Sequence, residues 1–152
     1  MIMSKTLNDL LDVVIRDEIN AQKFYRIMSE KTENPKLKAF FISLVNEENG
    51  HEAILRDLKD MEVFDGSVEV DEESLEKLEG AHIIDDAESI DDMTIERAMQ
   101  IAMKREDKAI QVYRQIAEST PNEEIMRLFF RIASDEQRHY DIIDQNYKIH
   151  TG

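Results

Sequence analysis

Apolar residues, with a glutamate or a histidine at six of the positions, recur along this chain at alternating intervals of four and three positions, in four separate stretches. The recurring positions are Leu7, Leu11, Val14, Glu18, Ala21, Tyr25 and Met28; Leu37, Phe41, Leu44, Glu48, His51, Leu55 and Leu58; Ile95, Met99, Ala102, Glu106, Ala109, Tyr113 and Ile116; and Ile125, Phe129, Ile132, Glu136, His139 and Ile143. This spacing places each set on one face of a helix and is typical of helices that pack at shallow angles. The pattern predicts an all-α four-helix bundle in which each helix has about 25 residues.

Turn and capping residues indicate where these helices begin. We expect the first helix to run from about Thr6 to Lys31. Asn34-Pro35 predicts an N-cap followed by proline at the first position of the second helix. The third helix should follow Asp91-Asp92 or Thr94, and Thr120-Pro121-Asn122-Glu123 predicts a capping box with proline just inside the fourth helix. Because only two or three residues join the first helix to the second and the third to the fourth, each pair should be an antiparallel hairpin.

The two hairpins are related by a constant offset of 88 positions in the sequence. Ten of the forty residue pairs between 14–53 and 102–141 are identical at this offset. Among the matched pairs are Glu18 and Glu106, Ala21 and Ala109, Tyr25 and Tyr113, Phe41 and Phe129. We infer two copies of one hairpin, related by a pseudo-two-fold axis within a single domain over residues 1–152.

The residues from about 61 to 92 depart from this helical pattern and are long enough for a crossover along the bundle. The hypothesis includes a short helix over Ser74–Glu79 and contacts of four aliphatic residues with the bundle surface: Val68, Val70, Ile83 and Ile84. Most of the chain's net charge of −15 lies in this connector. We interpret it as a solvated segment, and such an acidic chain disfavours nucleic-acid binding.

Two Glu-x-x-His motifs, Glu48–His51 and Glu136–His139, lie on the predicted core faces. One such motif alone is common on helix surfaces, but Glu18 and Glu106 occupy core positions on the other two helices. A buried carboxylate is costly unless a cation neutralises it. Four glutamates and two histidines therefore predict a dinuclear metal site, and oxygen-rich ligation suits iron or manganese. Two divalent ions would balance the four carboxylates.

The amino-acid composition excludes several classes of site and of protein. The chain has no cysteine, which excludes disulfides and cysteine-ligated iron–sulfur or rubredoxin-type centres within it. No apolar run approaches the ~20 residues of a membrane span, and the N-terminal residues do not resemble a signal peptide. We therefore expect a cytoplasmic protein without membrane association. Tyr25 and Tyr113 either pack in the core or support the ligands from the second coordination shell.

On these motifs the chain resembles the ferritin-like di-iron carboxylate proteins, nearest the rubrerythrin group. The resemblance implies that Glu18 and Glu106 are terminal carboxylates and that Glu48 and Glu136 bridge two iron ions. It further implies that His51 and His139 each bind one iron, giving an Fe–O–Fe type dinuclear site, with manganese as the alternative metal. A tyrosine on the first helix lies near the cluster in bacterioferritin, which implies the same place for Tyr25.

Three departures from the rubrerythrin pattern change the expectations. Rubrerythrins carry an extra third-helix glutamate three residues from the terminal one, but Met103 and Ala109 occupy the flanking positions here. Ligand switching of that kind is therefore not expected. Because the chain lacks the four cysteines of a rubredoxin-like domain, an external electron-donor protein is expected. The chain also ends soon after the fourth helix, which favours a homodimer over a 24-subunit storage shell.

The leading hypothesis is an oxidoreductase that reduces hydrogen peroxide or dioxygen at a di-iron site with electrons from a separate donor. A second hypothesis is ferroxidation with iron storage or trafficking. A third is a manganese catalase-like site, and a fourth is a structural bundle with a vestigial site. Sequence alone does not decide between iron and manganese, because the two metals share these ligands.

Overall fold

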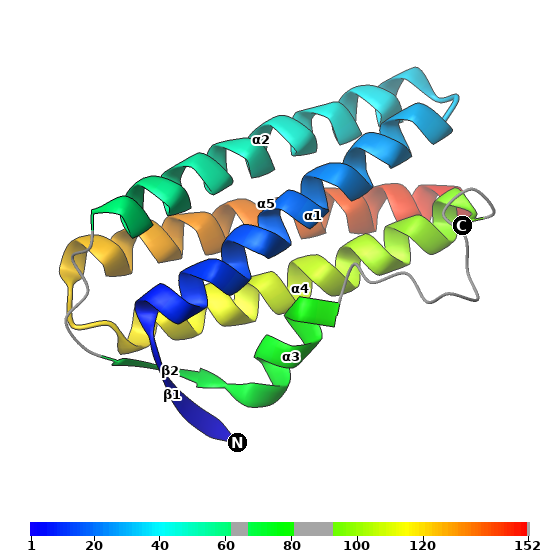
Figure 1. Cartoon of the computed structure of the whole chain (residues 1–152). Helices are drawn as coiled ribbons and strands as arrows, with labels where there is room; N and C mark the ends of the chain where they lie inside the picture. Colours follow the sequence, from blue (N-terminus) through cyan, green and yellow to red (C-terminus); the bar gives the residue numbers. More distant parts are fainter. Residues whose placement is uncertain (62–66, 81–92, 152) are drawn as a thin grey trace. The chain divides into compact units, whose positions relative to one another are not determined.

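The computed structural model describes residues 1–61, 67–80 and 93–151. Within these ranges the elements are β1 Ile2–Thr6, α1 Leu7–Lys31, α2 Pro35–Asp60, β2 Ser67–Asp71, α3 Glu72–Gly80, α4 Ile95–Ser119 and α5 Glu123–Thr151 (Figure 1). The chain divides into two compact units, one formed by Asn8–Val63 and the other by Met1–Leu7 with Phe64–Gly152. The all-α class is confirmed, while a single domain over residues 1–152 stays a prediction.

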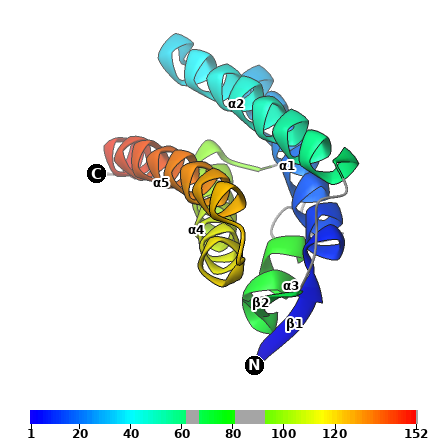
Figure 2. The ribbon, with the colours of Figure 1, turned by 90° about the vertical axis from the view of Figure 1, so that its left-hand side faces the viewer.

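The first unit is an antiparallel hairpin of α1 and α2 (Figures 1 and 2). Asn34 caps α2 as predicted, because its side chain accepts the backbone N–H groups of Lys36 and Leu37. Contacts along the hairpin fix the antiparallel pairing: Lys59 binds Asp12, Gln22 donates to Glu52 at 2.8 Å, and Tyr25 stacks on Phe41 at 6.2 Å between ring centroids. Residues early in α1 therefore meet residues late in α2.

The second unit contains the hairpin of α4 and α5, which is also antiparallel. Gln100 donates to the hydroxyl of Tyr147 at 2.7 Å near one end, and Tyr113 contacts Phe129 at 5.9 Å between ring centroids further along. Thr94 is the N-cap of α4, which agrees with one of the two predicted starts of this helix. The hydrophobic faces agree with the prediction as well: in all four long helices every expected core position is buried except Ile95, which is half-buried.

The start of α5 corrects one prediction. The residue that caps this helix is Asn122, whose Oδ1 accepts the backbone N–H of Ile125 at 3.1 Å. The helix begins at Glu123, so Pro121 precedes it and Thr120 is not its N-cap. Thr120 instead accepts the N–H of Asn122 at 3.3 Å, just as Thr32 accepts the N–H of Asn34 at 3.3 Å in the first hairpin. Asn122 is the N-cap because its side chain reaches the third backbone N–H of the helix. Thr120 lies two residues earlier and cannot reach it.

The described part of the connector contains a strand that the helical pattern did not predict. Val68 and Val70 are buried and Glu69 between them is exposed, and this alternation suits a strand with one face on the core. β2 pairs antiparallel with β1, from Ile2 opposite Asp71 to Thr6 opposite Ser67. Thr6 thus ends β1, and α1 begins at the next residue, Leu7, in agreement with the predicted start at about Thr6.

The short helix of the connector is confirmed, although α3 starts two residues earlier than predicted and ends one later. Three polar residues at four-residue spacing on α4 hold β2 and α3 in place. Ser119 accepts the N–H of Glu69 at 3.0 Å, Gln115 accepts that of Asp71 at 2.9 Å, and Gln111 lies 3.1 Å from the Ser74 hydroxyl. Val68 and Val70 are buried as expected, whereas Ile83 and Ile84 lie outside the described residues.

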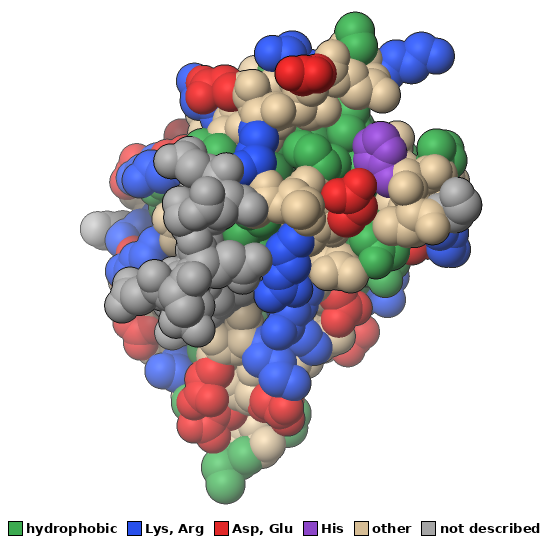
Figure 3. All heavy atoms as spheres, turned by 90° about the vertical axis from the view of Figure 1, so that its right-hand side faces the viewer, with side chains coloured by type: hydrophobic (Ala, Val, Ile, Leu, Met, Phe, Trp, Pro, Cys, Tyr) green, Lys and Arg blue, Asp and Glu red, His purple; other side chains and the backbone are tan. Residues whose placement is uncertain are grey.

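The outer faces of the long helices are charged and carry same-helix ion pairs. Arg56 binds Glu52, Arg127 binds Glu123 and Lys148 binds Asp144, each four residues apart. Figure 3 shows basic and acidic side chains side by side on the face that it draws. In the described part of the chain, no helix is long and apolar enough to cross a membrane.

Candidate metal centre

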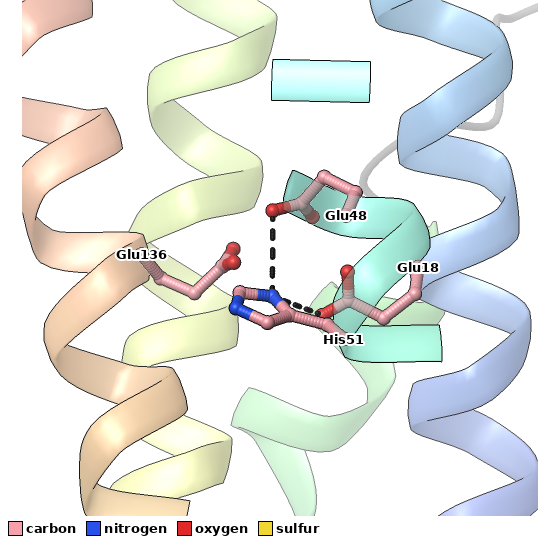
Figure 4. A group of neighbouring side chains, drawn as sticks. All are labelled: Glu18, Glu48, His51 and Glu136. Atoms are coloured by element: carbon pink, nitrogen blue, oxygen red, sulfur yellow. Dashed lines mark ion pairs between the residues drawn. The ribbon is translucent and has the colours of Figure 1, made fainter. Parts of the chain in front are cut away.

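The α1–α2 hairpin brings Glu18, Glu48 and His51 together, and we call these three residues the α1–α2 donor set. Glu48 and His51 lie one turn apart on α2, so they share a face, and Glu18 approaches from α1. The Nδ1 atom of His51 lies 3.7 Å from Oε1 of Glu18 and 3.6 Å from Oε1 of Glu48 (Figure 4). Both carboxylates are fully buried and the imidazole is 5% exposed.

The α4–α5 hairpin repeats this arrangement with Glu106, Glu136 and His139, the α4–α5 donor set. The Nδ1 atom of His139 lies 3.8 Å from Oε1 of Glu106 and 3.7 Å from Oε1 of Glu136. All three side chains are fully buried. Each distance agrees with its counterpart in the first hairpin to within 0.1 Å, so the offset of 88 positions in the sequence is also a repeat of site geometry.

These distances suit atoms that bind a common ion. At 3.6 to 3.8 Å the nitrogen and oxygen atoms are too far apart for a hydrogen bond between them. Two donors bound to one ion by bonds of about 2.0–2.2 Å, at angles near 110–120°, lie roughly 3.3–3.8 Å apart. Within each set one atom from every residue lies within 4.8 Å of the others. Two carboxylates and one imidazole are donors for a first-row metal ion such as iron or manganese, so the residues fit a metal site.

A buried arginine that sequence reasoning missed stands beside the second set. Arg105 is fully buried, and its Nη1 atom lies 3.2 Å from Oε1 of Glu106 and donates a hydrogen bond to Oε2 of Glu136. It directly precedes a predicted ligand but lies off the predicted core face, so the hydrophobic pattern did not indicate that it is buried. The sequence pattern gives no signal for this burial, because an arginine is normally exposed.

A further polar contact joins α1 to α2 next to His51. The Gln22 amide donates to Glu52 at 2.8 Å and lies 3.3 Å from the backbone oxygen of Glu18, while Arg56 donates to Glu52 at 2.7 Å. The hydrogen bond from Gln22 and then that from Arg56 hold the pKa of Glu52 below its usual value of 4.5. Glu52 is thus an anion that ties the helix bearing Glu48 and His51 to the helix bearing Glu18.

The two tyrosines lie where the sequence places them, two turns after Glu18 and Glu106 on the same helix faces. Both are fully buried, and each ring packs on a phenylalanine of the neighbouring helix, Tyr25 on Phe41 and Tyr113 on Phe129. Core packing is therefore confirmed for both. A supporting role toward the metal ligands stays a prediction.

Comparison with known proteins gives one match. The family model described as Rubrerythrin matches residues 9–147, which include all six residues of the two donor sets. Searches of curated proteins and of solved structures return no match. With the helical hairpins described above, the family match confirms the predicted ferritin-like fold class.

Proposed function

The chain belongs to the rubrerythrin family, and on that premise we propose that it is a di-iron oxidoreductase that reduces hydrogen peroxide or dioxygen. The observation that carries the proposal is the twofold occurrence of a buried Glu, Glu, His set with the same internal distances. Two such sets supply six ligands, the number that a dinuclear carboxylate centre uses. The family match adds support for a dinuclear centre, and iron as its metal is part of the proposal.

In this proposal Glu18 and His51 would hold one ion and Glu106 and His139 the other, and Glu48 and Glu136 would complete the ligation. Bound iron supplies the two electrons that, with two protons, convert one hydrogen peroxide to two water molecules. The protein's own contribution is to hold the six donors in place before metal arrives and to exclude bulk water from them. Burial of all four carboxylates serves both purposes. It fixes their rotamers, and it makes the charged carboxylates unfavourable without a bound cation.

The chain has no cysteine with which to hold a rubredoxin-type iron of its own, so a separate electron-donor protein should reduce the centre. We place the reaction in the cytoplasm and expect a homodimer. Manganese is the alternative metal, because it accepts the same donors. Metal analysis of the protein as purified separates the two.

Stopped-flow absorbance after anaerobic loading with Fe(II) tests this function. We expect oxidation by peroxide to be faster than for free Fe(II) and to require Glu48 and Glu136. Glu48→Ala and Glu136→Ala should each lose at least about 100-fold in rate, because mutation of even an outer-shell partner of a metal ligand costs about 10–100-fold. Glu124→Ala, at an exposed position of α5, is the matched control and should behave as the parent. Equal rates in all four proteins and in free Fe(II) would refute the proposal.

Ferroxidation with iron storage is the alternative outcome of the same experiment. It predicts continued uptake of Fe(II) beyond two ions per chain and a cage-sized particle by light scattering. Two ions per chain in a dimer, with multiple turnovers of peroxide, agree with the oxidoreductase.

A further inference from the structure

The repeat of the two donor sets breaks at one buried position. At the offset of 88, Arg105 of α4 corresponds to Asp17 of α1. Both side chains are buried, Arg105 fully and Asp17 to 4% exposure. The residue that precedes the first-helix glutamate is thus an anion in one hairpin and a cation in the other, although the donor sets themselves are the same.

The guanidinium group of Arg105 contacts carboxylate groups that would bind a metal ion in the α4–α5 donor set. Nη1 of Arg105 is 3.2 Å from Oε1 of Glu106, the same oxygen that lies 3.8 Å from Nδ1 of His139. The same nitrogen donates to Oε2 of Glu136, whose other oxygen also faces His139. One guanidinium nitrogen therefore binds both carboxylates of the α4–α5 donor set, and a metal ion entering this set has to compete with it for them.

The two donor sets therefore differ in formal charge. With Arg105, the ionised α4–α5 set has a formal charge of −1, whereas the two ionised carboxylates of the α1–α2 set carry −2. A nearby positive charge weakens the binding of a divalent cation, and a nearby negative charge strengthens it. The effect is large for buried groups, because little water or salt screens them.

We propose that Arg105 makes the two donor sets unequal, so that divalent metal ions load in order, the α1–α2 set first and the α4–α5 set second. Arg105 acts as a positioning residue: it holds Glu106 and Glu136 together and neutralises them until the second ion takes over their oxygens. This inference rests on the proposed function, because it takes the two sets to be the metal ligands.

The experiment is a titration with Mn(II) under argon, in which the electron paramagnetic resonance signal of the free ion reports what remains unbound. No oxidant is present, so the readout is independent of peroxide reduction. For the parent we expect two steps whose dissociation constants differ by at least about tenfold. In Arg105→Met, which keeps the length of the side chain without its charge, the second step should tighten by about tenfold and approach the first. Arg105→Lys keeps the charge and should keep most of the gap.

Two further variants assign the steps to the hairpins with Arg105 left in place. Glu106→Gln should remove the weak step and leave the tight one, and Glu18→Gln should remove the tight step. Arg127→Met is the matched control, since it removes an exposed arginine of α5 that pairs with Glu123, and it should leave both steps unchanged.

The outcomes separate the two proposals. Two ions bound with equal affinity in the parent, or a gap that Arg105→Met leaves unchanged, would overturn ordered loading and leave the metal centre standing. Loss of the weak step in Glu18→Gln would reverse the order and overturn it as well. No uptake of Mn(II) by any of the proteins, together with no uptake of Fe(II), would overturn ordered loading and the proposed function together.

Discussion

Oε1 of Glu18 on α1 lies 3.7 Å from Nδ1 of His51 on α2, so one carboxylate from each helix of the hairpin faces the same imidazole. A metal ion bound here would join the two helices as a crosslink. Metal binding should then stabilise the fold, by about 3 kcal/mol when the free ion is at a hundred times its dissociation constant. Glu18→Ala should lose most of this stabilisation.

Thermal unfolding with and without Mn(II) or anaerobic Fe(II) measures this effect. The control is Glu30→Ala, which removes an exposed glutamate from the same helix and should keep the full metal-induced rise in the melting temperature. A rise in Glu18→Ala equal to that of the parent would remove Glu18 from the ligand set.

Packing between each tyrosine and its phenylalanine partner should contribute equally in the two hairpins. Phe41 is 1% exposed and Phe129 is fully buried, and each meets a buried tyrosine ring. Truncating a buried phenylalanine to alanine usually costs about 3–5 kcal/mol. Phe41→Ala and Phe129→Ala should each lose stability in this range by urea denaturation. Phe130→Ala, beside Phe129 but 40% exposed, should lose less than about 1 kcal/mol.

The asparagine caps provide a test of the repeat at the level of single hydrogen bonds. Asn34 accepts the N–H of Leu37 at 3.2 Å and Asn122 that of Ile125 at 3.1 Å. Asn34→Ala and Asn122→Ala should each cost about 1 kcal/mol in the free energy of unfolding, as loss of an N-cap usually does. Thr120→Ala removes only an acceptor for the N–H of Asn122 and should cost less. A larger loss in Thr120→Ala than in Asn122→Ala would restore Thr120 as the cap.

The same caps show what the sequence could reveal and what it could not. The hydrophobic period and the offset of 88 were enough to predict the four long helices, their pairing in hairpins and the burial of the six residues of the two donor sets, because these depend on local spacing. The offset also relates Asn34 to Asn122, so the correct cap of α5 was available in the repeat. The capping-box pattern at Thr120 concealed it, because Thr-x-x-Glu fits the same four residues.

Other features depended on contacts between residues far apart in the chain. β1 forms only because Ile2–Thr6 meets Ser67–Asp71, and nothing near the N-terminus indicates a strand partner more than sixty residues away. Arg105 was missed for a similar reason. An arginine is normally exposed, and its burial here depends on the carboxylates of Glu106 and of Glu136, the latter on the following helix. Charge that is neutralised across helices leaves no periodic signal in the sequence.

The pH dependence of stability should include a contribution from Asp71, at the end of β2. Its Oδ2 accepts the backbone N–H of Ser74 at 2.9 Å, and the hydroxyl of Ser74 lies 3.0 Å away. The backbone hydrogen bond, and then the hydroxyl, lower the pKa of Asp71 from its usual value of 3.8. Because the pKa is lower in the folded state, ionised Asp71 stabilises the fold above pH 3.8. That stabilisation is lost as the pH falls through the lowered pKa.

Asp71→Asn keeps a side-chain acceptor for Ser74 but cannot ionise, so it isolates the charge. We expect it to be less stable than the parent at pH 7, with the difference shrinking as the pH falls below 3.8. Ser74→Ala removes the hydroxyl and retains the backbone N–H, so it should leave a smaller pH-dependent contribution of the same sign. Urea unfolding between pH 7 and pH 3 measures both, and hydrogen exchange at the Ser74 amide assigns the change to α3. A stability difference between parent and Asp71→Asn that is constant with pH would mean that the carboxylate charge contributes nothing to the start of this helix.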